Sequence, residues 1–315
     1  MRSTTKQAWM SDNIEEALES VTKETDQTNL VEIAENAPVM NVRIYAVGKV
    51  SDSKLLADIA KNSFYEDVSN VAAGMVSDPN LLIDIAKNAK DFRVRLVAIE
   101  RVHNQTVLED IIKMDTDFRV CRSAVKKLLN PIVLVDIAKN TKNSDVGRAV
   151  VEKVNDPKLL ADIAKEADDS DVRMAAIGKV NDPKLLGDII SETYYSDVGH
   201  AAVEKLLDQA LLAKIAKEAD DSDVGRAAVE KVNDPKLLAE IAIEADDSDV
   251  GRAAVEEVTD QALLAKIAQE ADDFDVRMAA VKKVTDQALL ADIAKNADDS
   301  DVRMTANKKL NDRSI

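Results

Sequence analysis

Aromatic residues are scarce in this sequence. Its 315 residues include four Phe, four Tyr and one Trp, and glycine (8) and proline (6) are also few. A single core in a chain of this length would normally depend on many aromatic side chains for volume. The rest of the composition is rich in Ala, Leu, Val, Lys, Asp and Glu, which is typical of a helical chain without large sheets.

Cysteine, excess positive charge and long apolar runs are lacking as well. One cysteine, Cys121, excludes an internal disulfide framework and a Cys-based metal cluster. With 59 acidic against 42 basic residues the formal charge is −17, which argues against a general binder of nucleic acid or anionic membranes. The first ten residues lack the apolar run of a signal peptide, and no apolar stretch is long enough to span a membrane. We therefore expect a soluble, acidic, cytoplasmic protein.

What the sequence does contain is a tandem repeat. A valine recurs every 26 residues without insertion or deletion. If this valine is numbered unit position 5, one full unit spans residues 168–193 and a near-copy spans residues 220–245. Because chance does not produce so many in-register copies, the repeat decides the fold prediction. The valines are residues 42, 68, 94, 120, 146, 172, 198, 224, 250, 276 and 302.

Each unit is predicted to contain two short amphipathic helices. Apolar residues recur at unit positions 5, 9, 10 and 13 and again at 18, 19, 22, 23 and 26, and this spacing is typical of helices. Between them lies Asn-Asp-Pro, as at residues 155–157, or Asp-Gln, as at residues 208–209. Asp is a good N-cap and Pro suits the first helical position. We predict helix A at about unit positions 4–13 and helix B at about 16–26.

Such short helices are marginal alone, so the units must stack on one another. Small residues at unit positions 8, 9 and 23 favour close helix contacts. We predict an all-α fold, an elongated α-solenoid superhelix of about eleven 26-residue helix-pair repeats with terminal caps. Residues 1–37 would form an N-terminal cap with an irregular first unit, residues 38–297 ten in-register repeats, and residues 298–315 a C-terminal capping helix.

The repeat resembles a known group. Asp-x-x-Val-Arg-x-x-Ala followed by Asp-Pro-x-Leu-Leu-x-x-Ile-Ala is similar to HEAT-like repeats and to their short relative, the leucine-rich-repeat variant, over about residues 12–312. The 26-residue unit is shorter than most HEAT units, and the cysteine-rich iron–sulfur segment of one variant-repeat protein has no counterpart here. The resemblance implies a right-handed superhelix with the B helices lining its concave side. It implies no single chemistry, because such repeats occur in scaffolds, peptide binders, DNA-repair enzymes and bilin-lyase-type proteins.

Candidate catalytic and metal-binding residues are few. His103 and His200 are far apart in the array, and no spacing of Cys, His and carboxylates indicates zinc. Cys121, at unit position 6, is expected to be partly exposed and has no organised base partner. The Asp-Asp-Ser-Asp loops, such as residues 220–223, lack the glycine and closing Glu of a calcium loop, so helix capping explains them better. We expect no catalytic site, no metal and no cofactor.

Helix A occurs in two kinds. Where unit position 6 is Gly, position 7 is Arg or His and position 11 is Glu, as in Gly225, Arg226 and Glu230. Where position 6 is Arg, position 7 is apolar, as in Met174. Gly within a helix costs about 1 kcal/mol relative to Ala, so a repeated Gly needs a reason. One explanation is recent copying of a unit, with an Arg–Glu pair four residues apart; the other is that positions 6, 7 and 11 form a display surface.

Two clusters are candidate binding surfaces. Arg93 and Arg119 replace the usual Asp at unit position 4, where a cation faces the positive helix end, and they lie in a basic island over residues 87–127. Tyr194 and Tyr195 lie near His200, and exposed aromatic residues often anchor partners. Alternatively, the aromatic residues fill gaps between units. The candidate binding residues are Phe92, Arg93, Arg95, Phe118, Arg119, Arg122, Tyr194, Tyr195 and His200.

The preferred hypothesis is a non-enzymatic scaffold that presents an extended helical surface to a protein or peptide. No nucleic-acid or membrane partner is expected, and self-association through the ends stays open. Rows of charge at unit positions 21 and 24, such as Asp58 and Lys61, are typical of a solvated helix face and add little. The alternatives are a bilin-lyase-type accessory enzyme, which would hold a chromophore, and an engineered or diversified repeat binder.

Overall fold

Every element is helical in the part of the chain that the structure describes, residues 8–312 of a computed structural model. Residues 1–7, which include most of the stretch examined for a signal peptide, and residues 313–315, the end of the predicted C-terminal cap, lie outside the described residues. The chain divides into two compact units, Met1–Lys153 and Val154–Ile315. Among the described residues no helix is both long and apolar enough to cross a membrane.

The helices of the first unit follow a 3-10 turn, η1 (Ala8–Met10). They are α1 (Ile14–Lys23), α2 (Gln27–Asn36), α3 (Met40–Lys49), α4 (Ser53–Asn62), α5 (Glu66–Met75), α6 (Pro79–Asn88), α7 (Phe92–Ile99), α8 (Gln105–Met114), α9 (Phe118–Lys127), α10 (Pro131–Asn140) and α11 (Ser144–Lys153).

The second unit continues the same alternation of A and B helices. Its helices are α12 (Pro157–Glu166), α13 (Ser170–Lys179), α14 (Pro183–Glu192), α15 (Ser196–Lys205), α16 (Gln209–Glu218), α17 (Ser222–Lys231), α18 (Pro235–Glu244), α19 (Ser248–Glu257), α20 (Gln261–Glu270), α21 (Phe274–Lys283), α22 (Gln287–Asn296) and α23 (Ser300–Asp312).

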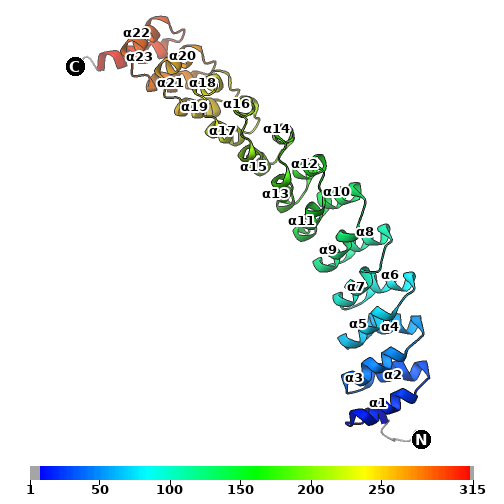
Figure 1. The fold of residues 1–315 in the computed structure, drawn as a ribbon. Coiled ribbons are helices and arrows are strands. Elements are labelled where there is room, and N and C mark those ends of the chain that lie inside the picture. The colour runs from blue at the N-terminus through cyan, green and yellow to red at the C-terminus, as the bar shows by residue number, and fades with distance from the viewer. Residues whose placement is uncertain (1–7, 313–315) are drawn as a thin grey trace. The chain divides into compact units, whose positions relative to one another are not determined.

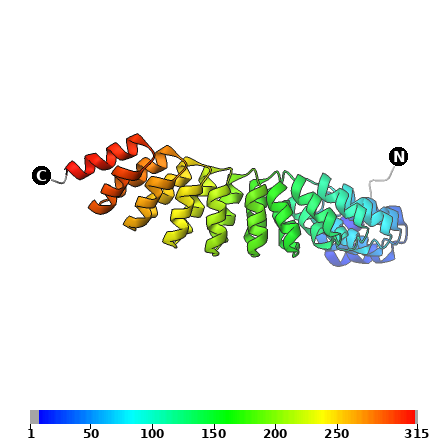
Figure 2. The ribbon, with the colours of Figure 1, turned by 90° about the horizontal axis from the view of Figure 1, so that it is seen from above.

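Within each of the two compact units the helices form two rows, which Figures 1 and 2 show as successive coils lying side by side. The odd-numbered A helices pack in sequence, as α13, α15 and α17 do, and so do the even-numbered B helices α12, α14 and α16. The closest hairpins join a B helix to the A helix after it, for example α4 to α5. The all-α prediction and the 26-residue helix-pair repeat are confirmed.

The N-cap residues that the sequence predicts for the helices are present. Asp156, Asp182 and Asp234 are the N-caps of α12, α14 and α18, and each precedes a proline at the first helical position. Asp221 and Asp247, the second residues of Asp-Asp-Ser-Asp loops, cap α17 and α19. A carboxylate at this place accepts bonds from backbone amides that have no partner inside the helix. The acidic loops are therefore helix starts.

The core is built from the apolar unit positions. In the unit of residues 168–193, Val172, Ala176, Ile177, Leu186 and Ile189 are at most 1% exposed. Alanines at unit position 26, such as Ala167, are also buried where a B helix ends. Because valine, isoleucine, leucine and alanine fill the space between helices only about 10 Å apart, the core needs few aromatic rings.

Cysteine, serine and glycine at unit position 6 are buried, which corrects one sequence-based expectation. Cys121 is 1% exposed rather than partly exposed. The alternative explanation of a display surface is not supported at these glycines, since a Cβ on Gly225 would lie 2.7 Å from Cγ2 of Val250 in the next A helix, and the same approach occurs at Gly199 and Gly251. These glycines let adjacent A helices come close together. At unit position 7 Arg226 is exposed, but it pairs with Asp223 at 2.7 Å and not with the Glu four residues later.

Basic side chains close the C-terminal ends of helices. Arg173, at unit position 6, donates from Nη1 to the carbonyl oxygens of Ala167 at 2.8 Å and Asp168 at 3.0 Å, just after α12. Lys205, at unit position 12, donates to the carbonyl oxygens of Ile177 and Gly178 in α13. Carbonyls at helix ends have no intrahelical donor, and cations suit the negative end of the helix dipole. Much of the chain's basic charge therefore serves the fold.

Candidate binding groove

The basic island between residues 87 and 127 is internally paired. The guanidinium of Arg119 lies 3.5 Å from the ring centroid of Phe92 and also pairs with Asp117 at 2.7 Å. Arg93 pairs with Glu66 and with Asp91. Phe118 is 41% exposed beside these groups, and its ring centroid is 5.9 Å from Arg119. Both arginines therefore have partners within the chain.

The other two arginines of the candidate list have separate roles. Arg95 lies in the first unit and binds Asp115 at 2.7 Å and 3.1 Å, together with the carbonyl oxygens of Ala89 and Lys90. It is a closing residue for the end of α6. Arg122 is half exposed on α9 and lies 3.6 Å from Glu152.

Electrostatics in the island favour the paired state. The hydrogen bond from Arg119 holds the pKa of Asp117 well below its ordinary value, at about 2. Asp117 also caps α9, accepting from the amide of Arg119. A small hollow of about 560 Å³ lies beside Phe92, Arg93 and Arg95, with Asp91 and Asp117 in its wall. An anionic partner would meet carboxylates as well as guanidinium groups here.

The tyrosine cluster is only partly brought together. Tyr195 occupies the N-cap of α15, where its side chain makes no capping bond, and its ring lies 3.6 Å below the guanidinium of Arg173. With Tyr195 at this place, α15 lacks the capping bond that an Asp would accept, which costs about 1 kcal/mol. The contact between Tyr195 and Arg173 offsets this cost. Tyr194, next to it, is 99% exposed. His200 is half-buried on α15 and does not line the cavity described next.

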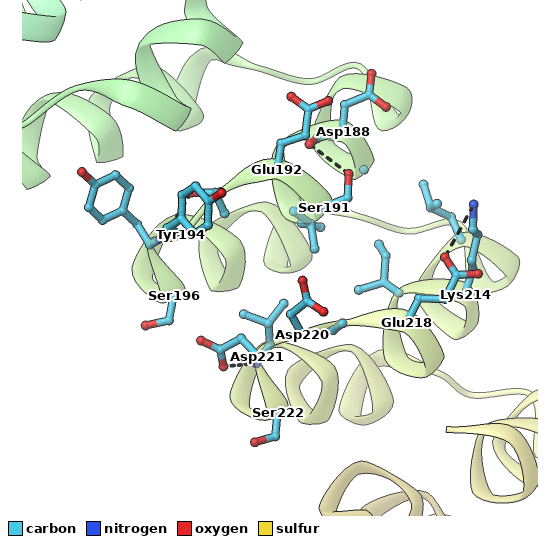
Figure 3. Close-up of a pocket in the computed structure, with 18 of the residues that line it drawn as sticks. Asp188, Ser191, Glu192, Tyr194, Ser196, Lys214, Glu218, Asp220, Asp221 and Ser222 are labelled. Carbon is cyan, nitrogen blue, oxygen red and sulfur yellow. Dashed lines mark hydrogen bonds and ion pairs between the residues drawn. The ribbon is translucent and has the colours of Figure 1, made fainter. Parts of the chain in front are cut away.

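A groove of about 1060 Å³ lies between α14 and α16 in the second unit. Its walls are the facing sides of these two B helices, and its end is closed by the loops of residues 193–196 and 219–222 (Figure 3). Tyr194 and Tyr195 contribute from the first loop, and Asp220 and Asp221 from the second. The structure thus joins two predicted binding residues to a cavity that the sequence did not indicate.

The groove exists because α14 departs from the repeat. At unit position 24, where Lys165 and Lys217 stand in the neighbouring B helices, α14 has Ser191. Unit position 23 carries Ile190 instead of the usual Ala. Unit position 20 carries Gly187, and a Cβ added to this glycine would lie 3.6 Å from Cδ1 of Leu211 in α16. A larger residue between the helices and smaller residues along them leave space that close-packed repeats fill.

The groove is acidic. Two lysines, Lys184 and Lys214, stand among its lining carboxylates. Lys214 pairs with Glu218 at 3.8 Å within α16, and Glu192 accepts a 2.7 Å bond from Lys165 on the other side of α14. Partly enclosed carboxylates of one sign concentrate a negative potential in a cleft. The carboxylates are Asp188, Glu192, Glu218, Asp220 and Asp221.

Sequence reasoning missed two features that the repeat register could have revealed. Phe64 and Tyr65 occupy the same unit positions as Tyr194 and Tyr195, and Phe64 is 94% exposed while Tyr65 stacks on Arg43 at 3.9 Å. Ser191 is visible as a gap in the row of lysines at unit position 24. In the described part of the chain no group of three His, Cys, Asp or Glu residues is arranged to hold a metal ion.

Comparison with known proteins gives little further information. No family model matches the chain, and no curated protein matches it. One solved structure, described as "Computational Design of Self-Assembling Cyclic Protein Homooligomers", aligns with 93% of this chain and 89% of its own, at 11% identity and a TM-score of 0.09. A similarity at this level carries no argument about function.

Proposed function

We propose that this protein is a non-enzymatic repeat scaffold that binds a protein or peptide, and that the groove between α14 and α16 is its binding site. The observation that carries the proposal is an open groove of about 1060 Å³ with the fully exposed ring of Tyr194 at its edge. Peptide and ligand sites are concave and often use an aromatic anchor. Repeat arrays present such surfaces on a fixed framework.

The family relationship belongs to the same proposal. The motif around Asp171-Val172-Arg173 resembles HEAT-like and leucine-rich-variant repeats. In this chain the arginine of that motif closes the end of the preceding helix and stacks on Tyr195. A residue shared for such a reason supports a common architecture and leaves the partner to the variable positions.

The groove is a better candidate than the basic island. Arg93, Arg95 and Arg119 each bind a carboxylate of the first compact unit, so a partner would have to replace those contacts. The Tyr194 ring has no such contact to lose, because it is 99% exposed. Binding there needs only the removal of water.

Selection from a displayed library of random twelve-residue peptides tests the proposal on the full chain. We expect the wild-type protein to enrich peptides that lose affinity for a Tyr194→Ala variant. Phe64→Ala is the matched control, since it removes an exposed ring from the same repeat position in the first compact unit. If no peptide is enriched over the bare support, or if both variants lose binding equally, the groove is not a peptide site.

A further inference from the structure

A ladder of ion pairs joins successive B helices. The lysine at unit position 24 of one helix reaches a carboxylate of the next, as Lys61 does to Asp84 at 2.7 Å and Lys87 to Asp110 at 2.8 Å. In the second unit Lys165 reaches Glu192 at 2.7 Å, and Lys217 reaches Glu244 at 2.9 Å. The bond from Asp84 raises the pKa of Lys61, so this lysine is held charged between the helices.

Two of these lysines lie between two carboxylates. Lys61 also contacts Asp58 of its own helix at 3.4 Å, and Lys165 contacts Asp162 at 3.7 Å. The partner in the same helix is at unit position 21, and the partner in the next helix is at position 21 or 25. In these two places the arrangement is a cation between two anions.

The ladder is interrupted between α14 and α16. Ser191 stands at unit position 24, and its hydroxyl donates to the carbonyl oxygen of Asp188 at 3.1 Å. The two carboxylates that would flank a lysine here are Asp188 and Glu218, and both line the groove. Glu218 turns to Lys214 of its own helix at 3.8 Å, and no ion pair between described residues joins α14 to α16.

A second interruption of the ladder lies between α18 and α20. There unit position 24 is Ile243, an apolar side chain that is itself half-buried. The equivalent carboxylates are Glu240 and Glu270, and Glu270 pairs with Lys266 at 3.7 Å. The gap at α14–α16 differs, because serine leaves the space open and Tyr194 stands exposed at its end.

We propose that the groove binds an extended peptide segment rich in Lys or Arg, and that one of its cations takes the place of the missing lysine between Asp188 and Glu218. This inference rests on the proposed function and names the chemistry of the partner. Charge complementarity selects the occupant, since five carboxylates and two lysines line the groove. The exposed face of Tyr194 offers a cation–π contact to a neighbouring basic residue.

Other occupants fit less well. A phosphorylated or acidic segment would bring negative charge to Asp188, Asp220 and Glu218. A second copy of the chain carries the same net charge of −17 and is repelled over most of its surface.

The test measures binding by fluorescence anisotropy with three labelled ten-residue peptides, which carry four Lys, four Gln or four Glu at the same places. The wild-type full chain is expected to bind the Lys peptide and to bind the Gln and Glu peptides at least about tenfold more weakly. Asp188→Asn/Glu218→Gln should weaken the Lys peptide by about tenfold. Ser191→Lys, which restores the residue common at this position, should abolish binding because the chain's own lysine fills the site.

Glu240→Gln/Glu270→Gln is the matched control. It removes two carboxylates from the same unit positions and changes the net charge equally, but it lies outside the groove. Binding should change less than about twofold, and helical circular dichroism should be the same for all variants.

The outcomes separate the inference from the function on which it rests. If the Gln peptide binds as tightly as the Lys peptide and Tyr194→Ala weakens both, the groove is a peptide site but its preference for cations is wrong. An equal loss in the control variant would mean general attraction to an acidic surface, and it would overturn the inference. No binding of any peptide overturns the proposed function as well. If sedimentation shows that the wild-type mass doubles as the protein concentration is raised, and that Ser191→Lys prevents this doubling, the groove binds a second copy of the chain instead.

Discussion

Burial controls the chemistry of Cys121. Its Sγ lies 3.3 Å from the carbonyl oxygen of Asp115, and burial raises the pKa of the thiol to about 11. At pH 8 the thiolate fraction is therefore about a hundredfold smaller than for a thiol with a pKa near 9. We expect the folded protein to react very slowly with a disulfide reagent at pH 8, and the urea-unfolded protein to react at once. Fast reaction of the folded protein would show that unit position 6 is open to solvent.

Arg173 tests how much a closing arginine contributes. Its guanidinium is 8% exposed and binds two carbonyl oxygens, the ring of Tyr195 and, at 3.5 Å, the carboxylate of Asp197. Arg173→Met keeps the aliphatic volume but leaves the two carbonyls without this donor. We expect a loss of about 1–3 kcal/mol in urea unfolding.

Arg226→Met is the matched control for that measurement. Arg226 is exposed in α17 and pairs only with Asp223, so its loss should cost less than about 1 kcal/mol. Equal effects of the two substitutions would mean that Arg173 contributes no more than a surface ion pair.

At the scale of the helix, glycines at two unit positions should behave in opposite ways. A Cβ on Gly225 would lie 2.7 Å from Cγ2 of Val250, whereas a Cβ on Gly178, at unit position 11, meets nothing within 4 Å. Gly178→Ala should stabilise the protein by about 0.5–1 kcal/mol, because it gains helix propensity alone. Gly225→Ala gains the same propensity but overpacks the contact between A helices, at a cost of about 1–3 kcal/mol.

Urea unfolding of both variants, followed by circular dichroism, checks this expectation. Val250→Ala combined with Gly225→Ala should recover part of the loss, because it removes the methyl group that the new Cβ meets. Stabilisation by Gly225→Ala would contradict the close approach of α17 and α19.

The helices could be predicted from the sequence because their signals are local. The valine every 26 residues, the apolar spacing and caps such as Asp182 place most helices close to their observed bounds, although α7 ends at Ile99, three residues before unit position 13. Whether unit position 6 faces the interior could not be predicted, since the residues found there (Arg, Gly, Ser and Cys) differ in polarity. They share a location at the end of a B helix, where Arg173 donates bonds and Gly225 allows contact.

The candidate site could be predicted from the sequence only in part, because some of its signals depend on contacts between repeats. Tyr194 and Tyr195 stood out as aromatic residues in an acidic loop. Ser191 signals the groove only once the lysines at unit position 24 are known to bridge helices. The contacts of Arg93 and Arg119 could not be predicted, because Glu66 and Phe92, which contact them, belong to neighbouring repeats.

At the scale of the whole chain, many of the lysines that offset the acidic residues are held in contacts within the fold. Lysines at unit position 12, such as Lys205 and Lys283, are bound to backbone carbonyls of the preceding unit. Lysines at unit position 24 are bound between helices, as Lys165 is. Acidic caps, by contrast, stay on exposed loops. A partner therefore meets acidic residues first, which favours basic ligands and raises their rate of association at low salt.

The repeat also determines how damage spreads through the molecule. Within each compact unit a B helix packs against the A helix after it, and helices of one row pack in sequence, as α13, α15 and α17 do, so a disturbance should fade within a few repeats. Leu264→Ala in α20 removes a side chain that is 1% exposed, which costs about 2–5 kcal/mol locally. Hydrogen exchange should then accelerate in α18–α22 and stay unchanged in α2–α5. Leu108→Ala in α8, a fully buried residue of the first unit, should give the converse pattern, with α20 unaffected. If either substitution accelerates exchange evenly along the chain, all the helices unfold together and the neighbour-only stabilisation that a repeat array implies does not hold for this protein.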